Sequence, residues 1–460
     1  MRITKAYLRT FLGSRSFYKS ALAVMIPVAI QQLINTLFNV ADTVMVGSLG
    51  GLSMSAVAVA NKPGLIYNGF FFGMTGAGGL LLSQYYGAGE KDQCQSIFSL
   101  ELLLGLCSSV GFCLLLALKP YWIMTLFVKD ETTIQLGVSY LKTISISYIP
   151  VAVSSTCIFS MRALGYNKMP MRVSLATILC NVILNYLFIF GKLGLPAMGV
   201  QGAALGTLLS RMMEMCIYLW VLSKKHAFFA LKPLAFLKLK IPVLKSFLRR
   251  AAPLTINELL WSSGLNIFFW AYAWLDEPSL PAITIAEQAM QVGMVLSIGM
   301  ASAVSVMVGR ELGAGNFQEA KQNCKRLFSL VGFISILCLM VGTVLAFFLP
   351  GIFQVDVSLR TLATQLTLVY TLFFPFNAMY AFCFFCLRAG GATRSAALLD
   401  SGYMWAIPIP FSVLLALLGK GKISLLPAVF IVQFLMNSKL FLALRTVYRG
   451  RWIKNITLEG

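Results

Sequence analysis

The stretch Pro27–Asp42 reads PVAIQQLINTLFNVAD, and the interpretation of the whole chain starts from it. It is apolar except for a few polar residues whose spacings of three, four and three place them on one face of a helix. A carboxylate in an apolar segment of membrane-spanning length is costly to expose to lipid. We therefore expect this face to line a cavity or to hydrogen-bond a neighbouring helix. The residues of this face are Gln32, Asn35, Asn39 and Asp42.

The composition is that of an integral membrane protein. Of the 460 residues, 58% are hydrophobic and only 12% are charged, about half the charged fraction of a soluble domain. Apolar stretches of roughly 20 residues recur, each long enough to cross a bilayer as a helix. The sequence predicts an all-α protein with twelve membrane spans. They are expected near 21–46, 53–83, 95–118, 136–161, 170–191, 199–222, 251–275, 282–309, 327–349, 362–387, 395–418 and 424–444.

The net charge of +21 follows the membrane topology. If the N-terminus lies inside, 28 of the 37 lysines and arginines fall in cytoplasmic segments, as the positive-inside rule requires. We therefore expect a multi-pass plasma-membrane protein with both termini in the cytoplasm. Its basic surface is expected to meet anionic membrane lipid, with no nucleic-acid partner.

The chain contains the same unit twice. Gly87 in SQYYGAG and Gly313 in GRELGAG are 226 residues apart, as are Arg162 and Arg388. Six spans separate equivalent points, so the two six-helix bundles have the same orientation, an arrangement typical of secondary transporters with a cleft between two halves. The predicted parts are an N-terminal lobe at 1–222, a basic cytoplasmic linker at 223–250, a C-terminal lobe at 251–446 and a cytoplasmic tail at 447–460.

Acidic residues in the second half are further candidates for function. Glu258 is the repeat equivalent of Gln32, and Trp261 lies one helical turn beyond it. A carboxylate beside an aromatic face suits an organic cation, although Trp261 could equally pack in the core or face lipid. Glu287, near the outer end of its span, is expected at the cleft or its mouth.

Lys62 lies within an apolar span, where an unpaired charge is costly. It could pair with Asp42 or Glu287, or reach the membrane interface. If it lined the cleft, it would favour neutral, zwitterionic or anionic substrates.

Three further acids, Glu101, Glu214 and Asp400, also fall within spans. We interpret them as partners of nearby basic groups. Arg211 and Glu214, three residues apart, can pair on one helix.

Several motifs together resemble the multidrug and toxic compound extrusion (MATE) family of transporters. They are FNVADTVMVGSLG, SQYYGAGEKD, SMRALG, MGVQGAALGT, NELLWSSG, GRELGAGNFQEAK and CLRAGG. The resemblance covers nearly the whole chain. It implies two six-helix lobes forming a V-shaped central cleft, and alternating access without enzymatic chemistry. It also implies export of small organic, often cationic, compounds in exchange for inward protons or sodium.

The resemblance also implies sites. One branch of the family binds its coupling ion in the N-terminal lobe, and the corresponding residues here would hold a proton or Na⁺. One position that is often aspartate in that branch is asparagine here, which favours a proton or weakly held sodium. Another branch uses a glutamate that matches Glu258, and a span-ten aspartate of some members falls on Asn377. The N-terminal set is Asp42, Asn181, Asn185 and Thr207.

Other classes of function fit less well. A lipid-linked saccharide flippase or a dedicated metabolite exporter of the same superfamily is the alternative to multidrug export. No phosphate-binding loop motif accompanies the GAG turns, which argues against an ATP-driven pump. We expect no cofactor beyond the coupling ion and a monomeric protein.

Overall fold

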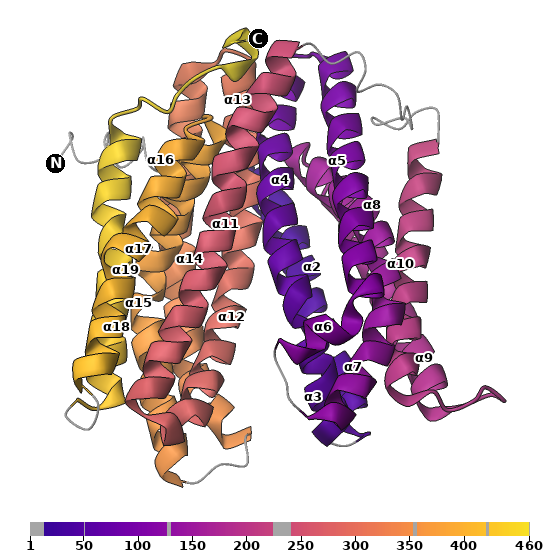
Figure 1. The fold of residues 1–460 in the computed structure, drawn as a ribbon. Coiled ribbons are helices and arrows are strands. Elements are labelled where there is room, and N and C mark those ends of the chain that lie inside the picture. Colours follow the sequence, from indigo (N-terminus) through magenta and orange to yellow (C-terminus); the bar gives the residue numbers. More distant parts are fainter. Residues whose placement is uncertain are drawn as a thin grey trace. The chain divides into compact units, whose positions relative to one another are not determined.

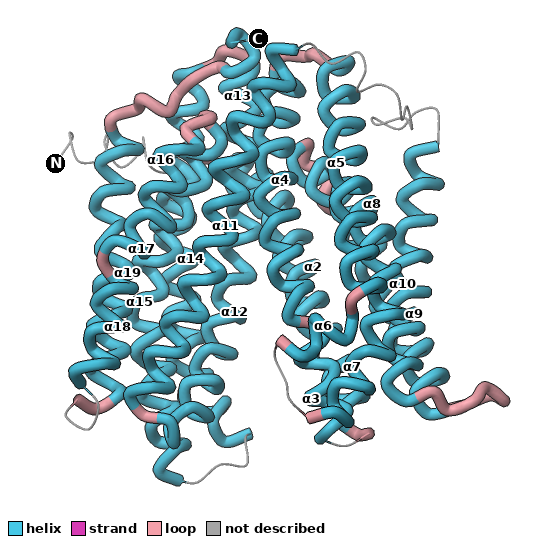
Figure 2. The backbone as a smooth tube through the Cα atoms, in the orientation of Figure 1, coloured by secondary structure: helices cyan, strands magenta, loops and turns pink. Residues whose placement is uncertain are grey.

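The computed structural model describes residues 13–49, 51–126, 130–223, 241–352, 357–419 and 423–459. Within these residues the protein is built from helices joined by short loops, and no strand occurs (Figure 2). Figure 1 labels the helices in chain order. Most of the predicted linker, 224–240, lies outside the described residues.

The first six predicted spans coincide with helices. The second span consists of α3 and α4, and the fourth of α7, a 3₁₀ turn and α8. The helices of this half are α2 (Arg15–Gly47), α3 (Gly51–Ala60), α4 (Lys62–Gly87), α5 (Lys91–Leu118), α6 (Pro120–Thr125), α7 (Glu131–Ile144), η1 (Ser145–Ser147), α8 (Tyr148–Ala163), α9 (Lys168–Phe190) and α10 (Gly199–Ser223).

The last six predicted spans are also helical. Two of them contain π-helical segments, η4 and η5, and a short 3₁₀ helix follows the last span. The helices of this half are α11 (Ile241–Leu275), η3 (Glu277–Ser279), α12 (Leu280–Val304), η4 (Ser305–Gly309), α13 (Arg310–Gly313), α14 (Phe317–Ile352), α15 (Val357–Ala389), α16 (Thr393–Ala397), η5 (Leu398–Gly402), α17 (Tyr403–Ala406), α18 (Pro408–Gly419), α19 (Leu425–Tyr448) and η6 (Ile456–Glu459).

Ten helical stretches in the described part of the chain are long and apolar enough to cross a membrane. The predicted spans 251–275 and 282–309 are α11 and α12, which are not among these ten. The protein is therefore an integral membrane protein, with a helix at every position where the sequence predicts a span.

The 226-residue repeat is visible in the helix boundaries. Helix α5 begins at Lys91 and α14 at Phe317, and α7 begins at Glu131 and α15 at Val357. Each pair of starting points differs by 226 residues. The two halves therefore share one register, and a residue of one half has a defined equivalent in the other.

Proline marks the breaks inside two predicted spans. The second span is interrupted at Asn61, directly before the Lys62-Pro63 pair that starts α4, and the eleventh at Ile407, before Pro408. Proline disfavours helical geometry in the residue before it, as at Ile407, and it is tolerated in the first turn of a helix, where Pro63 lies.

The chain forms two compact units. We call Ile30–Leu82 with Glu90–Lys245 the N-terminal unit, and Met1–Ala29, Ser83–Gly89 and Ser246–Gly460 the C-terminal unit, as far as they are described. In the N-terminal unit α9 packs on α10 and α5 on α8; in the C-terminal unit α15 packs on α12, α14 and α19. Helices α2 and α4 each run from one unit into the other. The predicted division into an N-terminal lobe at 1–222 and a C-terminal lobe at 251–446 stays a prediction.

Within the C-terminal unit, the two repeated GAG motifs pack against each other reciprocally. A Cβ added to Gly87 would lie 2.0 Å from the carbonyl oxygen of Arg310, and one added to Gly313 would lie 1.9 Å from that of Gln84. Gln84 and Arg310 are themselves repeat equivalents. The glycines are therefore required because two helix ends approach each other at backbone distance.

The C-terminal tail closes over this junction. The Gln84 side chain donates to the carbonyl of Ala389 at 2.7 Å and accepts from the backbone N–H of Ile456 at 2.8 Å. Trp452 and Ile456 are buried. The predicted tail is thus a packed part of the C-terminal unit.

Candidate functional site

The candidate ion site of the N-terminal unit is a hydrogen-bonded chain across three helices. Asn185 on α9 donates to the Asp42 carboxylate on α2. It also donates to the side-chain oxygen of Asn181 at 3.0 Å. Asn181 in turn donates to Thr207 at 3.3 Å and to Ser210 at 3.2 Å, both on α10. The structure therefore brings together the four residues implied by the resemblance and adds Ser210.

Glycines on α10 allow this approach. A Cβ on Gly206 would lie 2.2 Å from Asn185 Oδ1, and one on Gly202 would lie 2.5 Å from the carbonyl of Phe188. Small residues four apart let two membrane helices pack closely. The sequence QGAALG thus places α9 against α10, with Asn181 and Asn185 buried between them.

Asp42 is a half-buried carboxylate that forms no ion pair with the described residues. Arg211 is near enough to attract it, but Arg211 is bonded to Glu214 at 3.0 Å, which confirms the predicted pair. The positive charge of Arg211 is therefore already shared with another acid.

The hydrogen bonds indicate what the cluster can bind. A sodium ion needs several oxygen ligands. The Asn181 oxygen accepts from Asn185, whereas the Asn185 oxygen is buried with no hydrogen-bond partner among the described residues. A proton can bind to the second oxygen of Asp42 without breaking the bond from Asn185. A proton thus needs one oxygen of Asp42, whereas sodium needs oxygens from several residues of the cluster together.

The predicted polar face of α2 is only partly described. Gln32 and Asn35 are half-buried, and the side chain of Asn39 lies outside the described residues. The neighbouring Gln31 is fully buried: it accepts from Arg162 at 2.7 Å and donates to Ser174 at 2.7 Å. Sequence periodicity missed Gln31 because it lies next to the polar face and not on it.

The C-terminal unit holds a buried cluster of two acids and two bases. Arg388 contacts Glu258 at 3.4 Å, and Lys439 contacts Asp400 at 2.7 Å. Asp400 lies in the π-helical segment η5, and π-helical segments often occur at functional positions. Each acid therefore has its own cation.

Neutral groups complete the contacts of Asp400. Asn257 donates to it at 3.1 Å and Tyr380 at 3.1 Å, and the Lys439 ammonium lies 4.0 Å from the Tyr380 ring. The reading of Asp400 as a partner for a basic group is confirmed. Sequence reasoning did not anticipate the roles of Arg388, Lys439, Asn257 and Tyr380.

The repeat explains part of this cluster. Asn257 is equivalent to Gln31 and Asp400 to Ser174, and each pair is joined by a hydrogen bond between residues 143 apart. Arg162 and Arg388 are also equivalent. Arg162 donates to Gln31 on α2, and Arg388 donates to Glu258 on α11. The repeat pairs Arg162 with Arg388 in the sequence, but only the structure shows the contacts of Arg388 and Asn257.

The other predicted residues have distinct environments. Lys62 is exposed at the start of α4, and the ion pairs described here do not include it. Trp261 is half-buried and packs against the hydrophobic core of the C-terminal unit. Glu287 on α12 is half-buried and lies close enough to Tyr370 to interact with it electrostatically.

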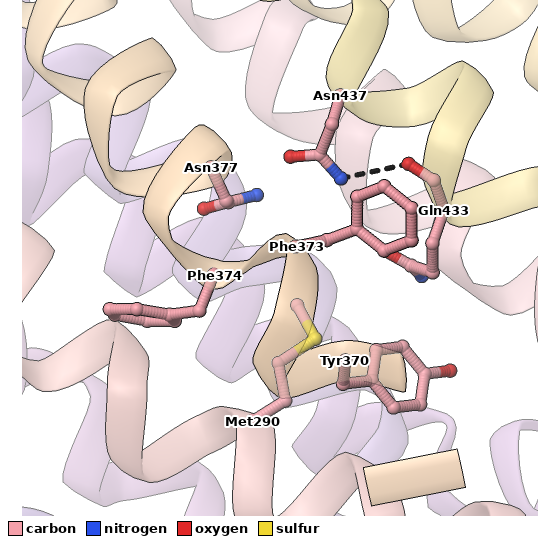
Figure 3. A pocket seen from close by; sticks show the side chains of 7 residues that line it. All are labelled: Met290, Tyr370, Phe373, Phe374, Asn377, Gln433 and Asn437. Atoms are coloured by element: carbon pink, nitrogen blue, oxygen red, sulfur yellow. Dashed lines mark hydrogen bonds between the residues drawn. The ribbon is translucent and has the colours of Figure 1, made fainter. Parts of the chain in front are cut away.

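Asn377 lines a pocket inside the C-terminal unit (Figure 3). The space inside it is about 10 Å³, which is room for about one water molecule. Aromatic rings and uncharged amides line it, and Asn437 donates to the backbone carbonyl of Gln433 at 2.8 Å. Its lining residues are Met290, Tyr370, Phe373, Phe374, Asn377, Gln433 and Asn437.

These features define a helical membrane transporter built from a duplicated unit. The MatE family model matches residues 27–187 and 253–414, two segments that begin 226 residues apart. The chain therefore belongs to the MATE family, whose members are transporters and not enzymes.

Named relatives and solved structures agree with this assignment. The chain is 24% identical over 399 residues to a probable multidrug resistance protein NorM of Thermotoga maritima, covering 85% of this chain and 84% of the relative. It is 25% identical over 405 residues to a NorM of Neisseria meningitidis, covering 86% of each.

Among solved structures, a MATE transporter in complex with MaL6 has a TM-score of 0.85 at 18% identity over 96% of this chain and 98% of that chain. The Vibrio cholerae MATE transporter VcmN in its bent form has a TM-score of 0.81 at 17% identity, over 95% and 98%. The predicted fold class, an all-α membrane protein of the MATE architecture, is confirmed.

Proposed function

We propose that the protein is a secondary active antiporter that exports organic compounds in exchange for inward protons, with Asp42 as the coupling acid. The names of the NorM relatives support multidrug efflux as the activity. One observation carries the choice of Asp42: it has no cation of its own among the described ion pairs, whereas Glu258 and Asp400 each have one. An acid already neutralised by a buried base is a poor site for a further cation.

Coupling by alternating access requires that proton and substrate favour different states of the transporter. Protonation of Asp42 removes the only formal charge of its cluster and changes the bond from Asn185. Because Asn185 also bonds Asn181, the change reaches α9 and α10. Sodium bound by Asp42, Asn181, Asn185 and Thr207 is the alternative coupling ion.

Transport in proteoliposomes tests this proposal. A fluorescent organic cation is followed under an imposed pH gradient or an imposed sodium gradient, for the wild type, Asp42→Asn and Glu258→Gln. We expect flux to follow the pH gradient, to be lost in Asp42→Asn and to persist in Glu258→Gln. Loss in Glu258→Gln alone would move coupling to the C-terminal unit. Absence of flux under either gradient would favour a dedicated metabolite exporter or a lipid-linked saccharide flippase.

The pocket of Figure 3 supports a substrate class. Its rings offer stacking surfaces, and Asn377 and Gln433 offer amide hydrogen bonds. Glu287 lies one helical turn from Met290 and beside Tyr370, so it supplies negative charge near the pocket. We propose that this unit takes planar aromatic compounds, with Glu287 selecting those that carry positive charge. The pocket holds about one water molecule in the state described, so such a compound requires it to widen.

We also propose a plasma-membrane location with both termini in the cytoplasm, from the distribution of basic residues. The same distribution supports contact with anionic lipid, and we propose a monomer. We propose further substrate contacts at Gln32, Asn35, Asn39, Lys62 and Trp261.

A further inference from the structure

Glu101 is a buried acid to which the proposed mechanism gives no part. It lies on α5 with 1% of its surface exposed. One carboxylate oxygen, Oε2, accepts from Ser160 on α8 at 3.3 Å, and the other, Oε1, has no hydrogen-bond partner among the described residues. The expectation that a basic residue would pair with Glu101 is wrong for the described part of the chain, whose ion pairs do not include it.

The helix opposite makes room for this carboxyl group. A Cβ added to Gly78 on α4 would lie 1.9 Å from Glu101 Oε1 and 2.0 Å from its Cδ. The carboxyl group therefore occupies the space that a side chain at position 78 would fill.

The second copy of the repeat shows that packing does not require an acid here. At a shift of 226, Glu101, Gly78 and Ser160 correspond to Leu327, Val304 and Cys386. All three of these equivalents are buried in the hydrophobic core of the C-terminal unit. One half thus fills the site with apolar groups, and the other replaces them with an acid, a glycine that accommodates it and a hydroxyl donor.

Among the described ion pairs, no positive charge stabilises an ionised Glu101. On α8, the Cys157 thiol lies within electrostatic range of both Glu101 and Glu214. Glu214, on α10, is neutralised by Arg211 at 3.0 Å. A carboxylate with a single hydroxyl donor and no cation is costly to bury inside a membrane protein. A protonated, neutral carboxyl group costs much less to bury.

We propose that Glu101 is a second proton-binding site of the N-terminal unit, beside Asp42, and that it exchanges its proton during transport. The exchange part of this inference rests on the proposed antiport function. Glu101 binds a proton in the arrangement seen here, and a movement of α4 or α8 that admits water or a donor to Oε1 releases it.

Infrared spectroscopy of the purified protein tests the first part without any transport. We expect a carbonyl band of a protonated carboxylic acid at neutral pH that is lost in Glu101→Gln. The matched control is Glu319→Gln, which removes an exposed acid paired with Arg326 at 3.0 Å and should leave the band intact. Glu101→Leu, which installs the residue of the other half, gives a second variant should the glutamine variant fold poorly. An unchanged band in both Glu101 variants would overturn the proposal.

Proton counting with a pH-sensitive dye tests the second part. Tetraphenylphosphonium is added to the detergent-solubilised wild type, Glu101→Gln and Asp42→Asn. We expect proton release to fall in each variant, because each removes a different site. Release from Glu101→Gln equal to that of the wild type would overturn the exchange and leave Glu101 a structural acid. If the wild type moves no substrate in liposomes, the proposed function fails, yet the infrared band still reports on Glu101.

Discussion

Asp42, Glu258 and Asp400 are all carboxylates inside predicted spans, but their neighbours give them different chemistry. Asp42 contacts an amide, whereas Glu258 and Asp400 contact Arg388 and Lys439. A buried acid with its own base is held in place by that base, whereas an acid among amides remains able to bind a cation. The type of residue alone does not assign a coupling role, and the partner decides it.

Removing Lys439 should destabilise the C-terminal unit. Lys439→Met leaves Asp400 buried without its cation, which typically costs roughly 3–5 kcal/mol. The measurement is the thermal unfolding midpoint in detergent. Lys439→Met combined with Asp400→Asn should recover part of the loss, because Asn257 and Tyr380 can still bond the amide. A double variant no more stable than Lys439→Met would contradict the ion-pair account.

Glu287 should matter for charged substrates only. Glu287→Gln removes the charge beside Tyr370 and should weaken binding of ethidium, a planar aromatic cation, about tenfold, the effect of roughly 1.4 kcal/mol. Binding of an uncharged aromatic compound should change little. Equilibrium binding to the solubilised protein measures both, with Glu319→Gln as a control. Equal weakening for the two ligands would point to a change in pocket shape and not in charge.

Individual helices meet at positions where glycine is required. Gly87 and Gly313 each face a backbone carbonyl across the junction of the two GAG motifs, and Gly206 faces Asn185. The sequence identified the GAG motifs as turns at span ends. It could not show that the two turns pack on each other, because this contact joins residues more than 200 positions apart.

Gly313→Ala should therefore be destabilising. Its Cβ would lie 1.9 Å from the carbonyl oxygen of Gln84, and overpacking of this kind costs about 1–3 kcal/mol. Gly111→Ala is the matched control, because nothing lies within 4 Å of its added Cβ and alanine favours a helix by up to about 1 kcal/mol. The thermal midpoint should fall in Gly313→Ala and rise in Gly111→Ala. A change in the same direction in both variants would argue against the close approach of Gly313 to the Gln84 carbonyl.

The start of α7 should show a pH-dependent contribution to stability. Asp130 caps this helix by accepting from the backbone N–H and the hydroxyl of Thr133, and these bonds lower the pKa of its carboxyl group. A pKa that is lower in the folded state stabilises the protein at pH values above the ordinary aspartate pKa. This contribution is lost as the pH falls through the pKa of the folded state. The stability difference between wild type and Asp130→Ala should shrink at acidic pH. Thermal midpoints at neutral and acidic pH measure it, and a constant difference would refute the cap.

At the scale of the whole molecule, the sequence predicted the fold class, the helix positions and the repeat. Hydropathy and the 226-residue shift depend on local composition, and a single sequence shows both. The charge cluster around Asp400 was missed because Asn257, Tyr380 and Lys439 come from three different helices. Family resemblance identified the candidate ion site, and the structure joins its residues by hydrogen bonds. These residues are Asp42, Asn181, Asn185 and Thr207.

The most direct test of the account is whether substrate can drive protons through Asp42. Proteoliposomes enclosing a pH-sensitive dye receive a tetraphenylphosphonium gradient with no initial pH difference. We predict proton movement opposite to the substrate in the wild type and in Glu258→Gln, and none in Asp42→Asn. Proton movement that persists in Asp42→Asn would contradict the assignment of coupling to the N-terminal unit.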